Sequence, residues 1–342
     1  MEVQKTVLCR LESCYAVAVA ELGGEPWYVA ASEAKQPCYA FSVQDTARRQ
    51  TLWEQPGGCM NIIQIPDGSE EFLAIQRFYS LYQWEEAQLV WVYRDGAGRF
   101  QSKVLTRIPY IHRIDVLRDG ERLYFVGCSV AQHKDALEDW HTGGQIYVGE
   151  LRPETRTLEN LKLLRDDLFQ NHGYCHQRDG EGEYGLIGCA QGIFEIRPQG
   201  GQWSLTRIFD RPVSDMALAD IDGDGVAELA TIEPFHGRYF RVYRFADGGW
   251  QQIFQHPETT EFYHVVWGGT LNGKPCFIGG CRRGRQQLFV LTGTPHGAVD
   301  IHLLEEGAGP SNVAVYHGPR GDCILSANRE RGEAAVYQIL EI

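Results

Sequence analysis

The segment Ala219-Asp220-Ile221-Asp222-Gly223-Asp224-Gly225-Val226-Ala227-Glu228-Leu229 joins two short apolar runs. Carboxylates stand at every second position from Asp220 to Asp224, and Glu228 follows after a further turn. A hard cation takes about six to eight oxygen ligands from a tightly turned loop, and glycines permit the positive φ angles of such a turn. The segment therefore predicts a structural Ca²⁺ site built from the side chains of Asp220, Asp222, Asp224 and Glu228. A solvated Asp/Gly hairpin turn is the alternative.

The flanks of this segment distinguish it from an EF-hand, whose loop opens with the same spacing. The twelfth position of such a loop would be Thr231 instead of Glu, and the neighbouring residues are typical of strands. The segment resembles the calcium-binding turn of the FG-GAP/VCBS repeats, which occur in β-propellers. That resemblance implies a bound Ca²⁺ at this turn and a propeller for the rest of the chain.

The bulk properties exclude several classes of protein. The chain has 342 residues and a net charge of -13, which argues against a general binder of nucleic acid or of anionic membranes. It has no apolar run of about eighteen residues that would span a membrane, and the polar start at residues 1–5 lacks the apolar core of a signal peptide. The ten cysteines are scattered without CxxC spacing, so we expect buried thiols and a cytoplasmic protein.

A repeated pattern of strand, polar turn and strand organises the whole sequence. Seven copies are expected, with first strands near residues 14–19, 60–63, 111–114, 172–176, 213–218, 263–266 and 312–315. Their spacing of roughly 40 to 60 residues is near the period of a four-stranded propeller blade. Two polar excursions, at residues 132–143 and 154–168, interrupt the pattern, and we expect a short helix near residues 161–164.

The two ends of the chain complement each other. The seventh repeat has a third strand at residues 335–339 and no fourth, whereas residues 6–10 form an extra strand before the first repeat. Pairing that strand into the last blade closes the ring and shields its edges. The sequence therefore predicts an all-β fold, a seven-bladed β-propeller of four-stranded blades over residues 1–342 as one domain. Two β-sandwich domains are the alternative, but no linker or break in composition supports them.

The predicted topology sorts the polar residues onto two faces. The start of each inner strand and the loop after the second strand lie on one face, and the acidic segment lies on the other. At the inner-strand starts stand Asn61, His112, His172, Asp215, His264 and Asn312. In the matching loops stand Arg77, Tyr79, His141, Glu233, His236, Arg282, Asn328 and Arg329.

A ring of imidazoles and carboxylates predicts either a metal centre or acid–base catalysis. The candidate ligands of a second divalent metal, such as Mn²⁺ or Zn²⁺, are His112, His172, His264, His236 and Glu233. The candidate catalytic residues are His112, His172, His264, Tyr79 as an acid, and Arg282 and Arg329 as anchors of an acidic group. The candidate substrate-binding residues are Asn61, Arg77, His141, Asn312 and Asn328. For each single residue, a hydrogen-bonded structural role or a solvated loop position is the alternative.

The residue inventory is similar to that of metal-assisted propeller lyases and dehydratases, such as the oligogalacturonate lyases and the aldos-2-ulose dehydratases. This resemblance lies in the architecture, without a diagnostic motif, and fold alone does not fix function. It implies β-elimination on a uronic acid or keto-sugar, with a small acidic sugar or oligosaccharide as partner. A non-catalytic platform that binds a glycan or protein through Trp84, Trp140 and Tyr263 is the alternative, and a hydrolase with a metal-bound water is a third hypothesis. Nothing in the sequence indicates the oligomeric state.

Overall fold

The computed structural model describes residues 1–67, 70–79, 84–294 and 298–341. The chain divides into two compact units. The terminal unit comprises Met1–Val17 and Pro212–Ile342, and the middle unit comprises Ala18–Arg211. The prediction of one domain over the whole chain stays a prediction.

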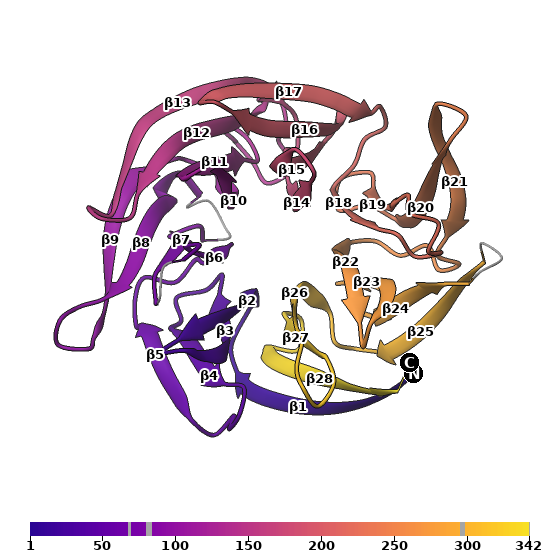
Figure 1. Cartoon of the computed structure of the whole chain (residues 1–342), viewed down its shortest axis with the longest axis horizontal. Coiled ribbons are helices and arrows are strands. Elements are labelled where there is room, and N and C mark those ends of the chain that lie inside the picture. Colours follow the sequence, from indigo (N-terminus) through magenta and orange to yellow (C-terminus); the bar gives the residue numbers. More distant parts are fainter. Residues whose placement is uncertain (68–69, 80–83, 295–297, 342) are drawn as a thin grey trace. The chain divides into compact units, whose positions relative to one another are not determined.

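Seven antiparallel sheets of four strands each make up the chain, which confirms the predicted fold class (Figure 1). In the middle unit the first two sheets contain β2 (Cys14–Leu22, whose first residues belong to the terminal unit), β3 (Glu25–Ser32), β4 (Cys38–Ser42), β5 (Arg49–Trp53), then β6 (Ile62–Gln64), β7 (Phe72–Gln76), β8 (Gln88–Arg94) and β9 (Phe100–Arg107). The next two contain β10 (Ile111–Asp119), β11 (Arg122–Ser129), β12 (Gly144–Arg152), β13 (Thr157–Leu168), then β14 (Gly173–Asp179), β15 (Gly182–Cys189), β16 (Gly192–Gln199) and β17 (Gln202–Phe209).

The terminal unit holds the other three sheets. Two of them contain β18 (Asp215–Ala219), β19 (Glu228–Glu233), β20 (Tyr239–Ala246), β21 (Gly249–Gln255), then β22 (Tyr263–Leu271), β23 (Lys274–Cys281), β24 (Leu288–Gly293) and β25 (Val299–Glu305). The last contains β26 (Pro310–Tyr316), β27 (Cys323–Asn328), β28 (Glu333–Glu341) and β1 (Glu2–Arg10). Among the described residues, the one helical segment is the 3₁₀ turn η1 (Trp84–Glu86) of the middle unit.

The first strand of the chain completes the last sheet, as the sequence predicts. β1 pairs antiparallel with β28, from Val3 opposite Ile339 to Arg10 opposite Glu333. The Lys5 ammonium also donates to the Glu333 carboxylate, at 2.7 Å. The two ends of the chain are therefore held side by side in the terminal unit (Figure 1).

Burial follows strand position within each sheet. The second and third strands carry continuous apolar runs: every residue of β7 is buried, and so are the first five of β8. Strands packed on both faces have such runs, whereas an outer strand alternates between buried and exposed residues. The outer strand β17 shows this alternation and ends with a buried Phe209. Burial on both faces therefore accounts for the continuous apolar runs of the second strands.

The short helix expected near residues 161–164 is wrong. These residues lie in β13, where Tyr147 pairs with Leu163 and Val148 with Lys162 of the outer strand. Leu161 and Leu163 point outward and are 37 % and 45 % exposed. The backbone of β12 supplies ladder partners along this whole segment, so hydrogen bonding to a neighbouring strand outweighs a weak local preference for helix.

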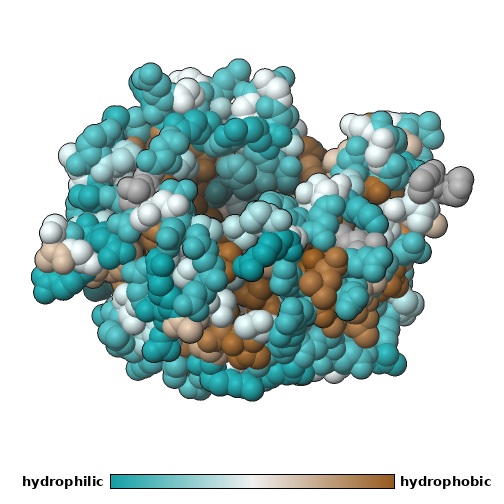
Figure 2. Space-filling model, turned by 60° about the horizontal axis from the view of Figure 1, so that its bottom comes forward, coloured by the Kyte–Doolittle hydropathy of each residue, from teal (hydrophilic) through white to brown (hydrophobic). Residues whose placement is uncertain are grey.

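No helix among the described residues is long and apolar enough to cross a membrane. No disulfide joins any of the ten cysteines, and eight of them are buried. On the face drawn in Figure 2, hydrophilic residues cover most of the surface and hydrophobic residues form smaller patches. The exposed large apolar side chains include Val7, Ile301 and Leu303, all on outer strands.

Candidate functional site

The antiparallel pairing within each blade brings the start of the inner strand beside the end of the second strand. In the terminal unit Asp215 pairs with Ile232, and Tyr263 pairs with Cys281. The turn between β18 and β19, which carries the acidic segment, lies at the opposite edge of the same sheet. The candidate residues of this unit therefore separate into an imidazole-bearing edge and an acidic edge, as the sequence predicts.

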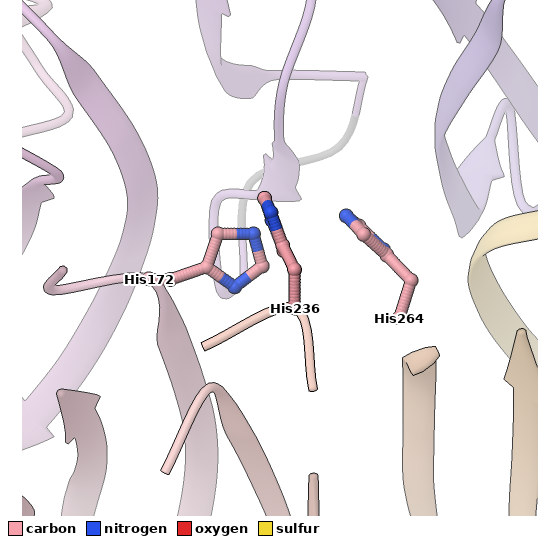
Figure 3. Close-up of side chains that lie close together, drawn as sticks. All are labelled: His172, His236 and His264. Atoms are coloured by element: carbon pink, nitrogen blue, oxygen red, sulfur yellow. The ribbon is translucent and has the colours of Figure 1, made fainter. Parts of the chain in front are cut away.

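An aromatic stack occupies the imidazole-bearing edge of the terminal unit. We call it the imidazole stack, and it consists of Phe235, His236, Phe262 and His264. The ring centroids of Phe235 and His236 are 3.9 Å apart, and those of His236 and Phe262 are 4.2 Å apart. The His236 and His264 rings are 5.5 Å apart and inclined by 26°. The two imidazoles thus face the same space from two adjacent blades (Figure 3).

The backbone around the imidazole stack is held in an unusual conformation. His236 has φ 45° and Phe262 has φ 71°, values that residues with a side chain seldom adopt. The Phe262 amide donates to the His236 carbonyl at 3.1 Å, and the Tyr263 amide donates to the Gly237 carbonyl at 3.0 Å. A Cβ on Gly237 would lie 2.2 Å from the carbonyl carbon of Glu233. Such over-determined strain is concentrated at binding and catalytic sites.

The hydrogen bonds of His264 fix its protonation pattern. Its Nδ1 lies 2.6 Å from the carbonyl oxygen of Ser311, so Nδ1 carries the hydrogen and donates it. Its Nε2 lies 3.1 Å from the Tyr15 hydroxyl, which donates to the remaining lone pair. The ring is only 2 % exposed. A backbone carbonyl on one ring nitrogen is the arrangement that orients a metal-binding or basic imidazole.

The middle unit contains a second imidazole pair. The rings of His112 and His172 have centroids 4.4 Å apart, and both residues are buried. The Phe78 ring meets His112 edge-on at 5.5 Å. Arg113 donates through Nε to the His172 carbonyl oxygen at 3.3 Å. Figure 3 also draws His172, and its membership of one site with His236 and His264 stays a prediction.

Several polar residues at the inner-strand starts connect neighbouring blades. The Asn61 side chain accepts from the Ile114 amide at 2.9 Å, and the Asn312 side chain donates to the Tyr15 carbonyl at 2.8 Å. Each bond joins the start of one inner strand to the next, as the His264–Ser311 bond also does. Asn61 and Asn312 therefore have a structural role, and their predicted contact with substrate stays a prediction.

Arginines flank the imidazole stack. The Arg282 guanidinium lies over the Phe262 ring, 4.6 Å from its centroid. Arg282 pairs with Glu330 at 2.8 Å, and Arg329 pairs with the same carboxylate oxygen at 3.0 Å. Two cations share one acid here, so the cluster has a net charge that suits an acidic ligand.

Two of the predicted residues are engaged in buried networks of their own blades. The Glu233 carboxylate accepts from Thr231 at 2.6 Å, from Tyr243 at 2.7 Å and from Arg241 at 2.6 Å. Asn328 is fully buried and bonds to Ser326, Glu333 and Tyr337. Because these partners occupy both groups, we leave Glu233 and Asn328 out of the proposed site.

The remaining predicted residues of the middle unit are His141, Arg77 and Tyr79. His141 is exposed and pairs through Nδ1 with Asp139. The Asp135 amide and His141 hold the pKa of Asp139 at about 2. Arg77 and Tyr79 line a cavity of about 440 Å³.

The acidic edge of the terminal unit binds its own backbone. Asp220 accepts from the Gly223 and Gly225 amides at 2.8 Å and 2.9 Å. Asp224 accepts from the Val226 amide, and Glu228 accepts from the Ile221 amide. Arg244 pairs with both Asp222 and Glu228. Burial raises the pKa of Glu228. The side chains of Asp220, Asp222 and Asp224 still gather closely enough to hold one ion, so the predicted Ca²⁺ stays a prediction.

Sequence reasoning missed Tyr15, Ser311 and Phe262. Tyr15 and Ser311 lie 249 and 47 residues from His264 along the chain, and no spacing marks them. Phe262 was hidden because an aromatic before a strand is ordinary core composition. His236 and Arg282 were found because they follow second strands of the repeat.

Comparison with known proteins places the fold but not a family. No family model matches the sequence, and no curated protein matches it. Among solved structures, the chain is similar to virginiamycin B lyase from Staphylococcus aureus, with 11 % identity, a TM-score of 0.62 and coverage of 99 % of each chain. It is also similar to a streptogramin B lyase, with 11 % identity, a TM-score of 0.60 and coverage of 98 % of this chain and 97 % of the other. Together with the seven sheets, these matches assign the chain to the seven-bladed β-propeller fold.

Proposed function

We propose that the protein is a lyase that cleaves a carbon–oxygen bond by β-elimination, with the imidazoles of the imidazole stack at the reacting carbon. The observation that carries this proposal is His264, whose Nδ1 is tied to the Ser311 carbonyl while Nε2 faces the Tyr15 hydroxyl. An imidazole so fixed is a base with one defined basic nitrogen. The two similar structures are both named as lyases, which supports the reaction class.

The residues of the terminal unit offer the base and the anchors that an elimination needs. Nε2 of His264 takes the proton from the carbon next to a carboxylate or carbonyl, and that electron pair forms the new C=C bond. The bond from the β-carbon to oxygen breaks, and the leaving oxygen takes a proton from a general acid. Tyr79, which the sequence predicts for that role, belongs to the middle unit. Arg282 and Arg329 hold the acidic group and stabilise the negative charge that develops on it.

The same imidazoles also fit a divalent metal such as Mn²⁺ or Zn²⁺. His236 and His264 offer nitrogen ligands, and the Ser311 carbonyl behind His264 is the kind of partner that orients a ligating imidazole. When bound, such an ion stabilises negative charge on the substrate oxygen. An ion on Nε2 would take the place of the Tyr15 hydroxyl, so Tyr15 and a metal compete for one lone pair.

The substrate that we propose is a uronic acid or keto-sugar, because both carry the acidic or carbonyl group that elimination needs. The streptogramin B lyases supply the competing possibility, since the substrate in their names is not a sugar.

The deciding experiment measures formation of a conjugated C=C bond by ultraviolet absorbance. The full chain is incubated with oligogalacturonate, with an aldos-2-ulose and, in a separate arm, with virginiamycin B. Each arm is run with Mn²⁺, with Zn²⁺ and with a chelator. We expect turnover of a sugar acid or keto-sugar, and the chelator arm then distinguishes whether Nε2 of His264 acts as the base or holds a metal. Turnover of virginiamycin B alone would support the lyase activity and contradict the sugar substrate. Absence of product in every arm would contradict the whole proposal.

A further inference from the structure

The middle unit contains a cavity of about 440 Å³. It is lined by Lys35, Gln55, Pro56, Arg77, Tyr79 and Glu86. The protein as a whole has a net charge of -13, yet this lining holds two cations and one acid. A locally basic cavity on a strongly acidic protein attracts an anion.

The cavity is built on three chain segments that cannot shift easily. The Gly58 amide donates to the Ala34 carbonyl at 3.1 Å, and the Arg77 amide donates to the Gly57 carbonyl at 2.9 Å. A Cβ on Gly57 would lie 1.9 Å from the Ala34 carbonyl oxygen. These close backbone contacts fix the loops that carry Lys35, Gln55 and Arg77.

The backbone of Arg77 is in the left-handed region, with φ 62°. That conformation is costly for a residue with a long side chain. Its hydrogen bond to Gly57 holds it there, and the result is a guanidinium at the cavity. Strain of this kind is retained where a side chain must be presented in one direction.

The charges of the cavity are only weakly neutralised. Arg77 lies 3.6 Å from Glu86, and both side chains are about half exposed, at 43 % and 54 %. An exposed ion pair of this length contributes little and yields to a better acceptor. Among the described residues no carboxylate pairs with the Lys35 ammonium, which lies over the Tyr79 ring, 5.4 Å from its centroid.

From these observations we infer that the cavity is a carboxylate-binding subsite. Arg77 gives two-point contact, Lys35 adds a second charge, and the net charge of one positive unit matches a single carboxylate. Phe78 lies between Arg77 and Tyr79 in the chain and contacts the His112 ring at 5.5 Å. The segment that supplies Arg77 and Tyr79 to the cavity therefore also contacts the imidazole pair of the middle unit. Carboxylate binding in this cavity does not depend on the proposed function, which assigns the substrate's acidic group to Arg282 and Arg329.

The experiment is calorimetric titration of the full chain with galacturonate, at constant ionic strength, with galactose as the neutral match and inorganic phosphate as a second anion. We expect galacturonate to bind and galactose to bind at least about tenfold more weakly. Equal binding of the two sugars, or tighter binding of phosphate, would overturn the carboxylate assignment.

Three substitutions test the inference, because two should weaken galacturonate binding and one should strengthen it. Arg77→Gln should weaken galacturonate binding about tenfold or more, and Lys35→Gln by several-fold, whereas Glu86→Gln should strengthen it about two- to fivefold. Arg99→Gln is the matched control, because Arg99 is 75 % exposed on the β8–β9 hairpin of the same blade. Unchanged binding in the Lys35 and Arg77 variants, or weaker binding in Glu86→Gln, would sink the inference. If the unsubstituted protein binds galacturonate but turns over no sugar acid or keto-sugar, the lyase proposal fails and the cavity inference stands.

Discussion

The two edges of the fifth and sixth blades carry the two strongest sequence signals, and their side chains are hydrogen-bonded in different ways. At the acidic edge, each of Asp220, Asp222, Asp224 and Glu228 accepts a hydrogen bond from the loop's own backbone. Arg244 adds a positive charge to this loop. At the imidazole-bearing edge, His264 uses one nitrogen for structure and directs the other toward a hydroxyl. A loop whose carboxylates bond to its own backbone is a weak sign of chemistry, whereas a buried imidazole oriented through both ring nitrogens, beside strained backbone at His236 and Phe262, is a stronger one.

The largest expected effect separates the two edges by activity. His264→Gln should lower turnover by about 10²- to 10⁴-fold, because it removes the basic nitrogen of an acid–base step. Asp224→Asn at the acidic edge should leave turnover within about twofold, since surface positions of this kind act mainly on local stability. Steady-state kinetics on the substrate that the absorbance assay identifies give both values, and circular dichroism checks that each variant folds. Equal losses in the two variants would erase the distinction.

A second prediction compares the backbone at the two edges. Gly237→Ala should reduce the free energy of unfolding by ~3 kcal/mol, because the added Cβ meets the Glu233 backbone at 2.2 Å. Gly223→Ala should cost about 1 kcal/mol, because it only imposes a left-handed backbone and meets nothing within 4 Å. Urea unfolding measures both. A larger loss in Gly223→Ala would place the strained structure at the acidic edge instead.

A third prediction concerns calcium. If the acidic edge binds Ca²⁺, a concentration of about ten times Kd should stabilise the fold by ~1.4 kcal/mol. Arg244→Gln should tighten this binding, because it removes the cation that pairs with Asp222 and Glu228. Thermal unfolding with Ca²⁺, with Mg²⁺ and with a chelator gives the shift. If Ca²⁺ does not change the melting temperature of either protein, the segment is a hydrogen-bonded turn and not an ion site.

The smallest effect concerns an imidazole that a carboxylate already satisfies. Burial lowers the pKa of His176, but the hydrogen bond and charge of the buried Asp115, at 2.8 Å, outweigh it and hold that pKa above its ordinary value. This pair stabilises the fold fully below the unfolded-state pKa of about 6.5, and the contribution is lost as pH rises through the higher folded-state pKa.

Because the His176 side chain is 43 % exposed, solvent screening limits that contribution to less than about 1 kcal/mol. Unfolding measured across this pH range should show the loss in the natural sequence and not in Asp115→Asn. The same slope in both proteins would mean that another group titrates there.

The sequence predicts the blades well because each one is a local hairpin pattern with a polar turn. The pairing of β1 with β28 also follows from counting strands, since a missing outer strand at one end matched a spare strand at the other. The conformation of residues 161–164 was predicted wrongly because it depends on pairing with β12, and the local pattern of apolar residues does not show that pairing.

The site could be predicted only in part. Position in the repeat is enough to place His236, His264 and Arg282 at one edge. Position in the repeat does not show which polar residues are occupied by structural hydrogen bonds, as Glu233 is by those from Thr231 and Tyr243. Partners such as Ser311 and Tyr15 contribute a carbonyl or a distant hydroxyl, and those contacts depend on three-dimensional packing that no spacing encodes.

The union of β1 with β28 also has a consequence for how the protein is made. The seventh blade borrows a strand that is synthesised more than 300 residues before the strand it pairs with, since Glu2 lies opposite Glu341. Until residues 333–341 emerge, the residues at 2–10 present an unmatched row of amides and carbonyls, which other chains can pair with. Closing a loop of this length is entropically slow. A nascent chain should therefore depend on chaperones until residues 333–341 have emerged, and a version permuted to begin at β2 and carry β1 after β28 should lose that dependence.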